Sequence, residues 1–188
     1  KDLVVEPEVE KGRVTLDYPL SAPDELADFK VRGFAKARVG TVDGGAFYGS
    51  GIDLTAARRP ATLLHSLELS GDVSVSLELV VFSRSPRSKL CVLLSKKVGV
   101  AWGQTICKPK SLKPYKRQRP ADLSVFNGQE SVKLEIRRKG DVLTVRCQGR
   151  LAGKHSFKKG ELDSFRFGLF LDGVRVVVER LRLEGDVN

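Results

Sequence analysis

The 188-residue sequence predicts an all-β protein, an antiparallel β-sandwich with very little helix. Three observations support this prediction. About twelve short extended segments follow one another at intervals of roughly 8–12 residues. Several of them alternate apolar and polar residues, which is the two-residue period of a half-buried strand. Gly, Pro and Asp turns separate them instead of helices, and no segment repeats at a fixed period, so a propeller or solenoid is not expected.

The N-terminal part divides at about residue 20. Residues 1–20 are predicted to form an edge strand or linker, and residues 21–188 a single sandwich domain. Pro19 ends any first strand, because proline cannot donate a hydrogen bond to a neighbouring strand. Ser21 is predicted to cap one short helix, which Gly33 ends within about three turns.

A hairpin is predicted next. Residues 34–39 alternate, residues 46–48 are extended, and Asp43-Gly44-Gly45 between them is a strong turn signal. The following Ser50-Gly51 and Thr55–Pro60 are predicted to be loops.

The clearest strand of the sequence comes after a weaker one. Residues 63–69 are predicted as a strand that ends at Ser70-Gly71-Asp72. Five apolar residues then alternate with smaller or polar ones, which predicts one buried and one exposed face. They are Val73, Val75, Leu77, Leu79 and Val81.

The second half continues the pattern around one long loop. Residues 90–94 and 98–103 are predicted as short strands, and Lys108–Pro120 as a loop because three prolines interrupt it. Further strands are predicted at residues 132–138, 142–147, 150–154, 162–171 and 174–183.

Composition limits the class of protein. The net charge of +10 attracts polyanions such as nucleic acid, anionic lipid or acidic polysaccharide. No apolar run approaches the roughly 20 residues of a membrane span, so no transmembrane segment is expected. The sequence contains no Met, even at position 1, and we therefore expect it to be part of a larger chain.

The cysteines and histidines do not predict a metal centre. Cys91, Cys107 and Cys147 are widely spaced, there is no C-x-x-C, and only two His occur, which makes a structural zinc site improbable. Buried free thiols are expected, and one disulfide among the three stays open. No cofactor is predicted. Calcium is the one candidate metal, because four Asp or Asn side chains in predicted turns could supply oxygen ligands. The favoured explanation is structural, since turns commonly contain Asp and Asn. The four residues are Asp43, Asp72, Asp172 and Asn127.

Two regions resemble the concanavalin A-like jelly rolls, in particular their laminin-G-like and keto-disaccharide-hydrolase-like branches. The first comprises residues 37–48, with an Asp-Gly turn and aromatic residues, followed by Gly-Asp and a hydrophobic strand within 69–78. The second is the ending, at residues 167–171, 174–178 and 181–185. The resemblance implies a concanavalin A-like jelly roll. That fold hosts lectins, glycosidases and interaction domains.

The catalytic pattern of this superfamily is not present. Its glucanases carry Glu-x-Asp-x-x-Glu on one strand, and this full pattern does not occur here. Glu68 and Glu78 are on different predicted elements, and His65 is more readily explained as a hydrogen-bonded sheet residue than as a base. No single substitution of these three residues is expected to abolish an activity, so the sequence favours a protein that is not an enzyme.

Three aromatic residues are candidate platforms for stacking on a sugar ring: Tyr48, Trp102 and Tyr115. For Tyr48 and Trp102 the favoured interpretation is burial in the core. Tyr115 is expected to be exposed, because it lies in the basic Lys108–Pro120 loop. That loop is predicted either to bind polyanions or to be simply solvated. Its cations are Lys108, Lys110, Lys113, Lys116, Arg117 and Arg119.

Together these features predict a non-catalytic, lectin-like binding module of a larger protein. Its expected ligand is a carbohydrate, most of all an acidic one. Two alternatives stay open. One is a glycan hydrolase with an unrecognised carboxylate pair, and the other is a nucleic-acid-binding module.

Overall fold

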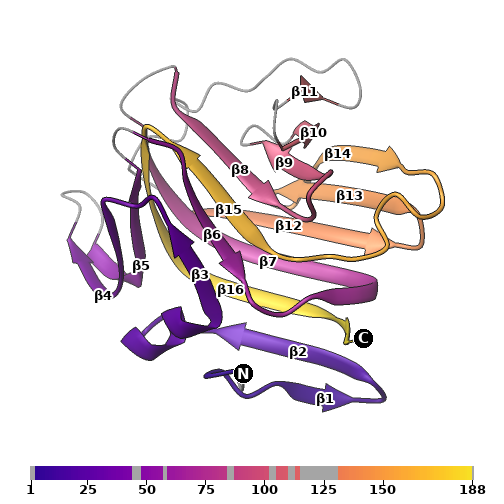
Figure 1. Ribbon diagram of the computed structural model, residues 1–188, viewed down its shortest axis with the longest axis horizontal. Coiled ribbons are helices and arrows are strands. Elements are labelled where there is room, and N and C mark those ends of the chain that lie inside the picture. The colour runs from indigo at the N-terminus through magenta and orange to yellow at the C-terminus, as the bar shows by residue number, and fades with distance from the viewer. Residues whose placement is uncertain are drawn as a thin grey trace.

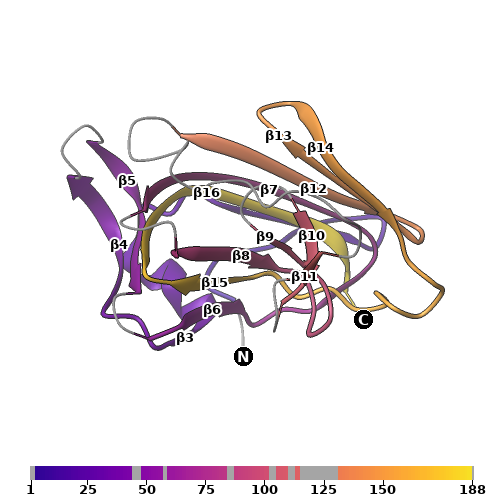
Figure 2. The ribbon, with the colours of Figure 1, turned by 90° about the horizontal axis from the view of Figure 1, so that it is seen from above.

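The computed structural model describes residues 3–43, 48–56, 59–83, 87–101, 105–109, 113–114 and 131–187. These residues form two antiparallel sheets that pack face to face, with β7, β12 and β16 in one layer and β6, β8 and β15 in the other (Figures 1 and 2). The predicted all-β sandwich with very little helix is confirmed. No helix among the described residues is long and apolar enough to cross a membrane.

The larger sheet has nine strands in the order β1-β2-β16-β7-β12-β13-β14, with the β4–β5 hairpin joined to β16 through β5. Strand β16 is long enough to pair with β5 along its first half and with β2 along its second half. The strands are β1 (Glu8–Glu10), β2 (Arg13–Tyr18), β4 (Lys36–Asp43), β5 (Tyr48–Ala56), β7 (Leu69–Ser83), β12 (Val132–Lys139), β13 (Val142–Cys147), β14 (Arg150–Ser156) and β16 (Val174–Val187).

The smaller sheet has seven strands in the order β11-β10-β9-β8-β15-β6-β3. They are β3 (Phe29–Arg32), β6 (Ala61–His65), β8 (Lys89–Leu93), β9 (Gly99–Ala101), β10 (Thr105–Lys108), β11 (Lys113–Pro114) and β15 (Gly168–Asp172).

The core lies between the two sheets and follows the alternation of the sequence. The apolar residues of β7 from Val73 to Val81 are buried, and Leu77 lies opposite Leu134 on one side and Leu181 on the other. Residues of the smaller sheet such as Val92 and Leu169 complete the same cluster. The alternating side chains therefore leave each sheet with one inner face toward the core and one outer face.

Two predicted loops are strands in the structure. Ser50, Gly51 and Thr55 belong to β5. Gly51 packs so closely on Val178 of β16 that a Cβ would overlap the Val178 carbonyl oxygen. Ser70-Gly71-Asp72 does not end a strand but lies inside β7. There Gly71 takes a positive φ of 64° beside the Asp186 carboxylate, opposite an irregularity in β16. Both glycines serve a close approach within the sheet instead of a turn.

Other boundaries also differ. The predicted strand at 162–171 begins only at Gly168, and the Lys108–Pro120 loop contains the two residues of β11. The one helix in the described part of the chain is a 3-10 helix, Pro23–Asp28, and Ser21 does not cap it. Instead, the buried Glu25 carboxylate accepts hydrogen bonds from the backbone N–H groups of Leu20, Ser21 and Ala22, each at 2.9 Å.

A buried carboxylate ties the β4–β5 hairpin to β16. Asp53 of β5 is fully buried and accepts two hydrogen bonds from the Arg175 guanidinium, at 2.9 and 3.0 Å, and one from Lys36 Nζ. Burial by itself would raise the pKa of Asp53, but the bonds from Arg175 and Lys36 outweigh it and lower that pKa. This ion-paired group joins three strands at one point of the sheet.

Candidate functional site

The predicted site residues do not come together in the part of the chain that the structure describes. Tyr48 begins β5 and is 78% exposed, so the favoured interpretation of Tyr48 as a core residue is wrong. It is the first residue of the second strand of the β4–β5 hairpin, where it pairs with Asp43 and its side chain lies in solvent. Lys108 is exposed at the end of β10, in the other sheet and on the other side of the molecule (Figures 1 and 2).

The remaining predicted residues all belong to the segment from Trp102 to Arg119. Lys113 lies in β11, whose backbone pairs with β10. The others lie outside the described residues, and they are Trp102, Lys110, Tyr115, Lys116, Arg117 and Arg119.

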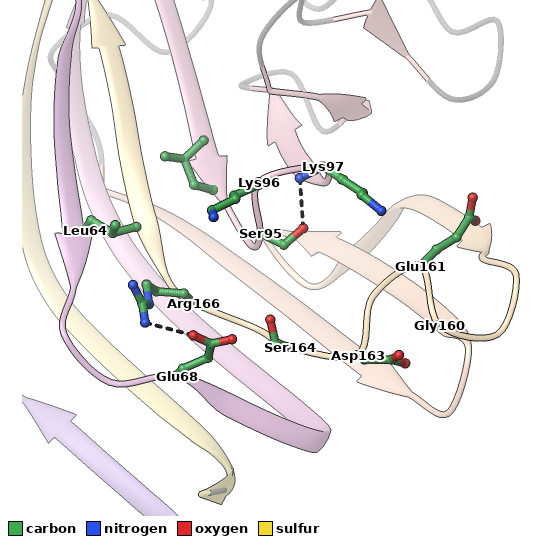
Figure 3. A pocket seen from close by; sticks show the side chains of 11 residues that line it. Leu64, Glu68, Ser95, Lys96, Lys97, Gly160, Glu161, Asp163, Ser164 and Arg166 are labelled. Atoms are coloured by element: carbon green, nitrogen blue, oxygen red, sulfur yellow. Dashed lines mark hydrogen bonds and ion pairs between the residues drawn. The ribbon is translucent and has the colours of Figure 1, made fainter.

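The structure instead forms a cavity of about 640 Å³ at one end of the outer face of the smaller sheet. Three separate segments surround it: residues 66–68 between β6 and β7, residues 94–98 between β8 and β9, and residues 157–167 between β14 and β15. Figure 3 shows their side chains converging from these segments. Sequence spacing cannot reveal such a site, because its parts are about 30 and 60 residues apart along the chain.

The floor of the cavity is apolar. Leu64 of β6 and Leu93 of β8 lie in one cross-strand row on either side of Gly168 in β15. A Cβ on Gly168 would lie 2.9 Å from Leu64 Cδ1 and 3.4 Å from Leu93 Cβ. The glycine therefore lets the two leucines close over the central strand, and their methyl groups form the base on which a ligand can rest.

One wall carries an ion pair. Arg166 Nη2 donates to Glu68 Oε2 at 2.8 Å, and in Figure 3 the two side chains point toward each other. A hydrogen bond from Ser164 is the main cause that lowers the pKa of Glu68, with Arg166 contributing in the same direction. Glu68 is therefore a carboxylate at neutral pH, and it presents hydrogen-bond acceptors beside the donors of Arg166.

The opposite walls are two turns held by their own hydrogen bonds. Ser95 Oγ accepts from the backbone N–H groups of Lys97 and Val98, both at 3.1 Å. Glu161 accepts from the backbone N–H of Lys158 at 2.9 Å and closes the second turn. These bonds fix the backbone that presents the polar side chains to the cavity.

The charges that line the cavity balance. Three carboxylates face three cations: Glu68, Glu161 and Asp163 against Lys96, Lys97 and Arg166. Charged and hydroxyl groups around an apolar floor can bind a polar ligand that has one apolar face.

Two of these carboxylates correspond in part to the catalytic motif considered above. Glu161-Leu162-Asp163 has the Glu-x-Asp spacing, but Arg166 stands where the motif requires its second glutamate. These residues also lie in turns ahead of β15, not on a strand. Glu68 is ionised by its partners, whereas a general acid needs a raised pKa. The cavity therefore does not reproduce the strand-borne carboxylate motif of the glucanases.

His65 is a buried structural residue, as the sequence favoured. It is 1% exposed and its Nε2 lies 2.7 Å from the Tyr18 hydroxyl. Tyr18 in turn donates to Asp28 Oδ2 at 2.9 Å. The remaining capacity of Asp28 is taken by the backbone N–H groups of Val4 and Val5, which fastens the N-terminal segment to the sheet.

The candidate calcium ligands are scattered over the structure. Asp72 accepts from the backbone N–H of Gly140, Asp172 pairs with Lys89 at 4.0 Å, and Asn127 lies outside the described residues. Within the described ranges no group of three or more His, Cys, Asp or Glu side chains could hold a metal ion. The candidates among the described residues therefore do not come together as a calcium site.

Solved structures identify the architecture. A Bacillus subtilis protein of unknown function with a galectin-like fold aligns with a TM-score of 0.61 and 7% identity, over 92% of this chain and 96% of that chain. The fold is a concanavalin A-like jelly roll. The resemblance seen in the sequence is thus confirmed at the level of fold.

Two sugar-bound structures align over similar lengths of this jelly roll. The exoplasmic/lumenal domain of VIP36, in its Ca²⁺/mannose-bound form, has a TM-score of 0.58 and 9% identity, over 90% of this chain and 88% of its own. The lectin UEA-II in complex with galactose has a TM-score of 0.55 and 12% identity, over 91% of this chain and 98% of the UEA-II chain. No protein-family model matches the sequence, and no curated protein matches it either. At these identities the likeness concerns the fold alone.

Proposed function

We propose that this chain is a non-catalytic carbohydrate-binding module of a larger protein, and that the cavity beside Glu68 and Arg166 is its sugar site. The observation that carries the proposal is the Glu68–Arg166 pair standing over the Leu64–Leu93 floor. A sugar ring needs both features, since its hydroxyls exchange hydrogen bonds and its C–H face packs on apolar groups. The lectins that share this fold, crystallised with mannose and galactose, support the same class of ligand.

The pair suits hydroxyl groups for a chemical reason. A carboxylate only accepts hydrogen bonds and a guanidinium only donates them, so neighbouring hydroxyls can satisfy both at once. Hydrogen bonds to charged groups contribute about 1.5–3 kcal/mol each. Two such bonds, added to burial on the leucine floor, are enough for the weak to moderate affinity expected of one sugar in a shallow site.

A glycan-array screen of the purified chain tests the proposal, followed by titration of the bound glycan against variants. Glu68→Gln and Arg166→Gln should each lower affinity about 10- to 100-fold, since each removes a charged hydrogen bond. The matched control is Asp17→Asn with Arg180→Gln, an ion pair of the same kind and distance on the other sheet. Equal affinity of the cavity and control variants would reject the cavity as the sugar site.

Hydrolysis is the second candidate, because the cavity does gather three carboxylates. Incubating the chain with each glycan that it binds, and analysing the products, separates the two functions. Turnover that disappears in Glu68→Gln or Asp163→Asn would replace the binding module with an enzyme.

We also propose an acidic carbohydrate as the preferred ligand. The balanced charge of the cavity does not select for it, so the selection must come from another part of the surface. The net charge of +10 and the cations from Lys108 to Arg119 support this preference. Whether that segment binds polyanions stays a prediction, since most of it lies outside the described residues.

A further inference from the structure

The positive charge of the described residues is concentrated on one group of strands. Residues 131–161, which form β12, β13 and β14, carry nine Lys or Arg against three Asp or Glu. This surplus of six is more than half of the net charge of +10. No short run of the sequence predicts this surplus, because the cations are spread along three strands.

Strand pairing brings several of these cations onto one face. Leu134, Ile136, Leu143 and Val145 point into the core, so the residues between them point outward. Register then places Arg137 opposite Thr144, and Thr144 opposite Lys154, in one row across the three strands. Ser74 of β7 extends the same row on the other side of Arg137.

Arg146 adds a further cation beside that row. It follows Thr144 by two residues on β13 and is exposed on the same face. Its register partner Glu135 is bound by Lys133, with Nζ and Oε1 3.5 Å apart. Arg146 itself donates to the backbone oxygen of Gly149 at 3.1 Å, which orients its guanidinium without neutralising it. We call Arg137, Arg146 and Lys154, with the hydroxyls of Ser74 and Thr144, the basic face.

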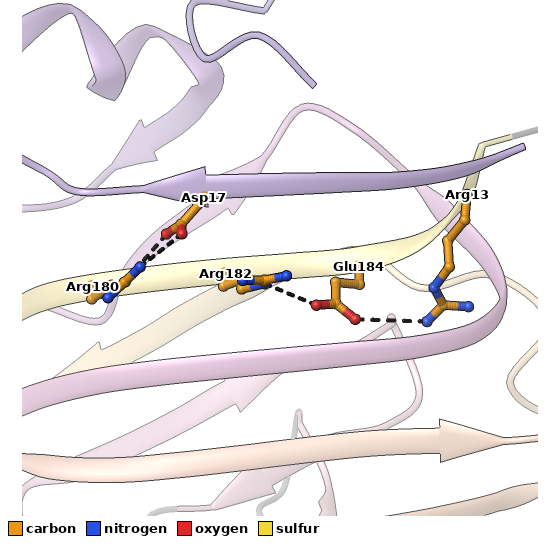
Figure 4. A network of polar contacts seen from close by, with 5 residues as sticks. All are labelled: Arg13, Asp17, Arg180, Arg182 and Glu184. Atoms are coloured by element: carbon orange, nitrogen blue, oxygen red, sulfur yellow. Dashed lines mark hydrogen bonds and ion pairs between the residues drawn. The ribbon is translucent and has the colours of Figure 1, made fainter. Parts of the chain in front are cut away.

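On the other half of the same sheet, the exposed arginines are paired with carboxylates. On β2 and β16, Arg180 donates to Asp17 at 2.8 Å, Arg182 donates to Glu184 at 2.8 Å, and Arg13 lies 4.0 Å from Glu184 (Figure 4). By contrast, no acidic side chain among the described residues lies within ion-pair distance of the cations of the basic face. One sheet therefore has a charge-compensated half and an uncompensated half.

The basic face also adjoins the segment predicted from sequence. Strand β10, which ends at the exposed Lys108, comes close to β14 although the two belong to different sheets. The run of cations that starts at Lys108 therefore begins beside the basic strands.

We propose that the basic face of β12–β14 binds an acidic polysaccharide, one that carries sulfate or carboxylate groups along its length. Uncompensated cations supply the charge complement, and the hydroxyls between them can donate to the anionic oxygens. This surface is separate from the cavity, and its anchoring of a charged chain would supply the selectivity for acidic glycans that the cavity lacks.

The side chains of this face favour a polysaccharide over a nucleic acid, a choice that rests on the proposed carbohydrate function. Single-stranded nucleic acids are held on sheets by aromatic rings that stack with the bases. The outward-pointing side chains of β12–β14 include no aromatic ring. Reading of duplex DNA requires an element that enters a groove, and among the described residues no helix or protruding ribbon projects from this face.

The test compares two variants that remove the same charge from the two halves of one sheet. Arg137→Ser, Arg146→Ser and Lys154→Ser together remove the basic face, and Arg13→Ser, Arg180→Ser and Arg182→Ser remove the compensated half. Affinity for heparin, measured at several salt concentrations, should fall at least about ten-fold in the first variant and its salt dependence should become shallower. The second variant should lose about three-fold or less, since it loses only the long-range attraction.

Equal losses in the two triple variants would overturn the proposal and show that the charge acts diffusely. Single- or double-stranded DNA that competes as well as heparan sulfate at equal charge would reassign the face to nucleic acid. Circular dichroism and urea midpoints check folding. If either triple variant does not fold, Arg137→Ser with Lys154→Ser is compared with Arg180→Ser and Arg182→Ser.

The Glu68→Gln variant keeps the two proposals distinguishable. Its loss of affinity is measured on the glycan bound at the cavity, whereas the loss in the basic-face variant is measured on heparin, because the two surfaces lie on different sheets. Heparin binding that depends on the basic face, without any glycan bound at the cavity, would reject the sugar site and keep the polysaccharide surface. The reverse outcome would keep the sugar site and reject the basic face.

Discussion

The thiols of Cys91 and Cys107 lie 3.9 Å apart, although their strands are not neighbours. Cys91 is in β8 and Cys107 in β10, and β9 lies between them. Cys107 pairs directly with Gly99 of β9, and a Cβ on that glycine would lie 2.7 Å from Cys91 Sγ. The missing side chain of Gly99 is thus what lets the two sulfur atoms meet across the intervening strand.

This placement answers a question that the sequence left open. A disulfide needs Cα atoms about 4.4–6.8 Å apart, whereas strands separated by a third strand are about 9–10 Å apart. The pair cannot close without displacing β9, and all three cysteines are free in the structure. The hydrogen bond between the two thiols raises the pKa of Cys91 and lowers that of Cys107, so Cys91 keeps its proton.

The first prediction concerns Gly99. Gly99→Ala should lower the free energy of unfolding by about 1–3 kcal/mol, because the new Cβ would overlap Cys91 Sγ and lie 2.9 Å from the Val92 carbonyl oxygen. Urea denaturation measures the change. Cys91→Ala in the same chain removes one of the two overlaps and should recover part of the loss. A cost below about 0.5 kcal/mol would mean that β9 is not closely packed here.

The chain of hydrogen bonds around His65 implies a definite proton arrangement. The backbone N–H of Leu67 donates to Nδ1 at 3.0 Å, so Nδ1 carries no proton and the proton of the neutral ring is on Nε2. Nε2 then donates to Tyr18, and Tyr18 donates to Asp28. Burial disfavours a charge on this ring and lowers the pKa of His65 from 6.5 to about 4.

The second prediction is that stability falls between pH 6.5 and 4 because of His65. Above pH 6.5 the imidazole is neutral in both states, but between pH 6.5 and about 4 only the unfolded chain binds the proton. Stability is therefore lost as the pH falls through this window, by up to about 3 kcal/mol. Urea unfolding at pH 7.5, 6, 5 and 4 measures it. His65→Gln should be less stable at pH 7.5 and should lose less stability on acidification. If the free energy of unfolding changed with pH in the same way in both proteins, the loss would not come from His65.

The third prediction tests the centre of the core. Leu77→Ala should cost about 2–5 kcal/mol, because the fully buried Leu77 packs between Leu134 and Leu181 in the middle of the larger sheet. Its neighbour Ser76 points to the outer face, and Ser76→Ala should cost less than about 0.5 kcal/mol. Chemical denaturation of both variants compares the two faces of one strand. Similar costs at the two positions would contradict the assigned faces.

Local patterns predicted the parts of this structure that depend on neighbours along the chain. The alternation from Val73 to Val81 places one face of β7 in the core, and the Asp43-Gly44-Gly45 turn predicts the hairpin β4–β5. Local rules failed at Gly51 and Gly71, where glycine serves contacts with β16 instead of a turn. No local pattern can show those contacts, because the partner strand is more than 100 residues away.

The class of fold follows from the order of residues along the chain, because the two-residue period already decides which side chains face the core. The places where ligands can bind follow from the packing of distant strands. The cavity needs Glu68 and Arg166 from segments about 100 residues apart, and the basic face needs Arg137 and Lys154 aligned by strand register. Both depend on which strands become neighbours, and that is settled by burial of the whole core and not by any short stretch of residues.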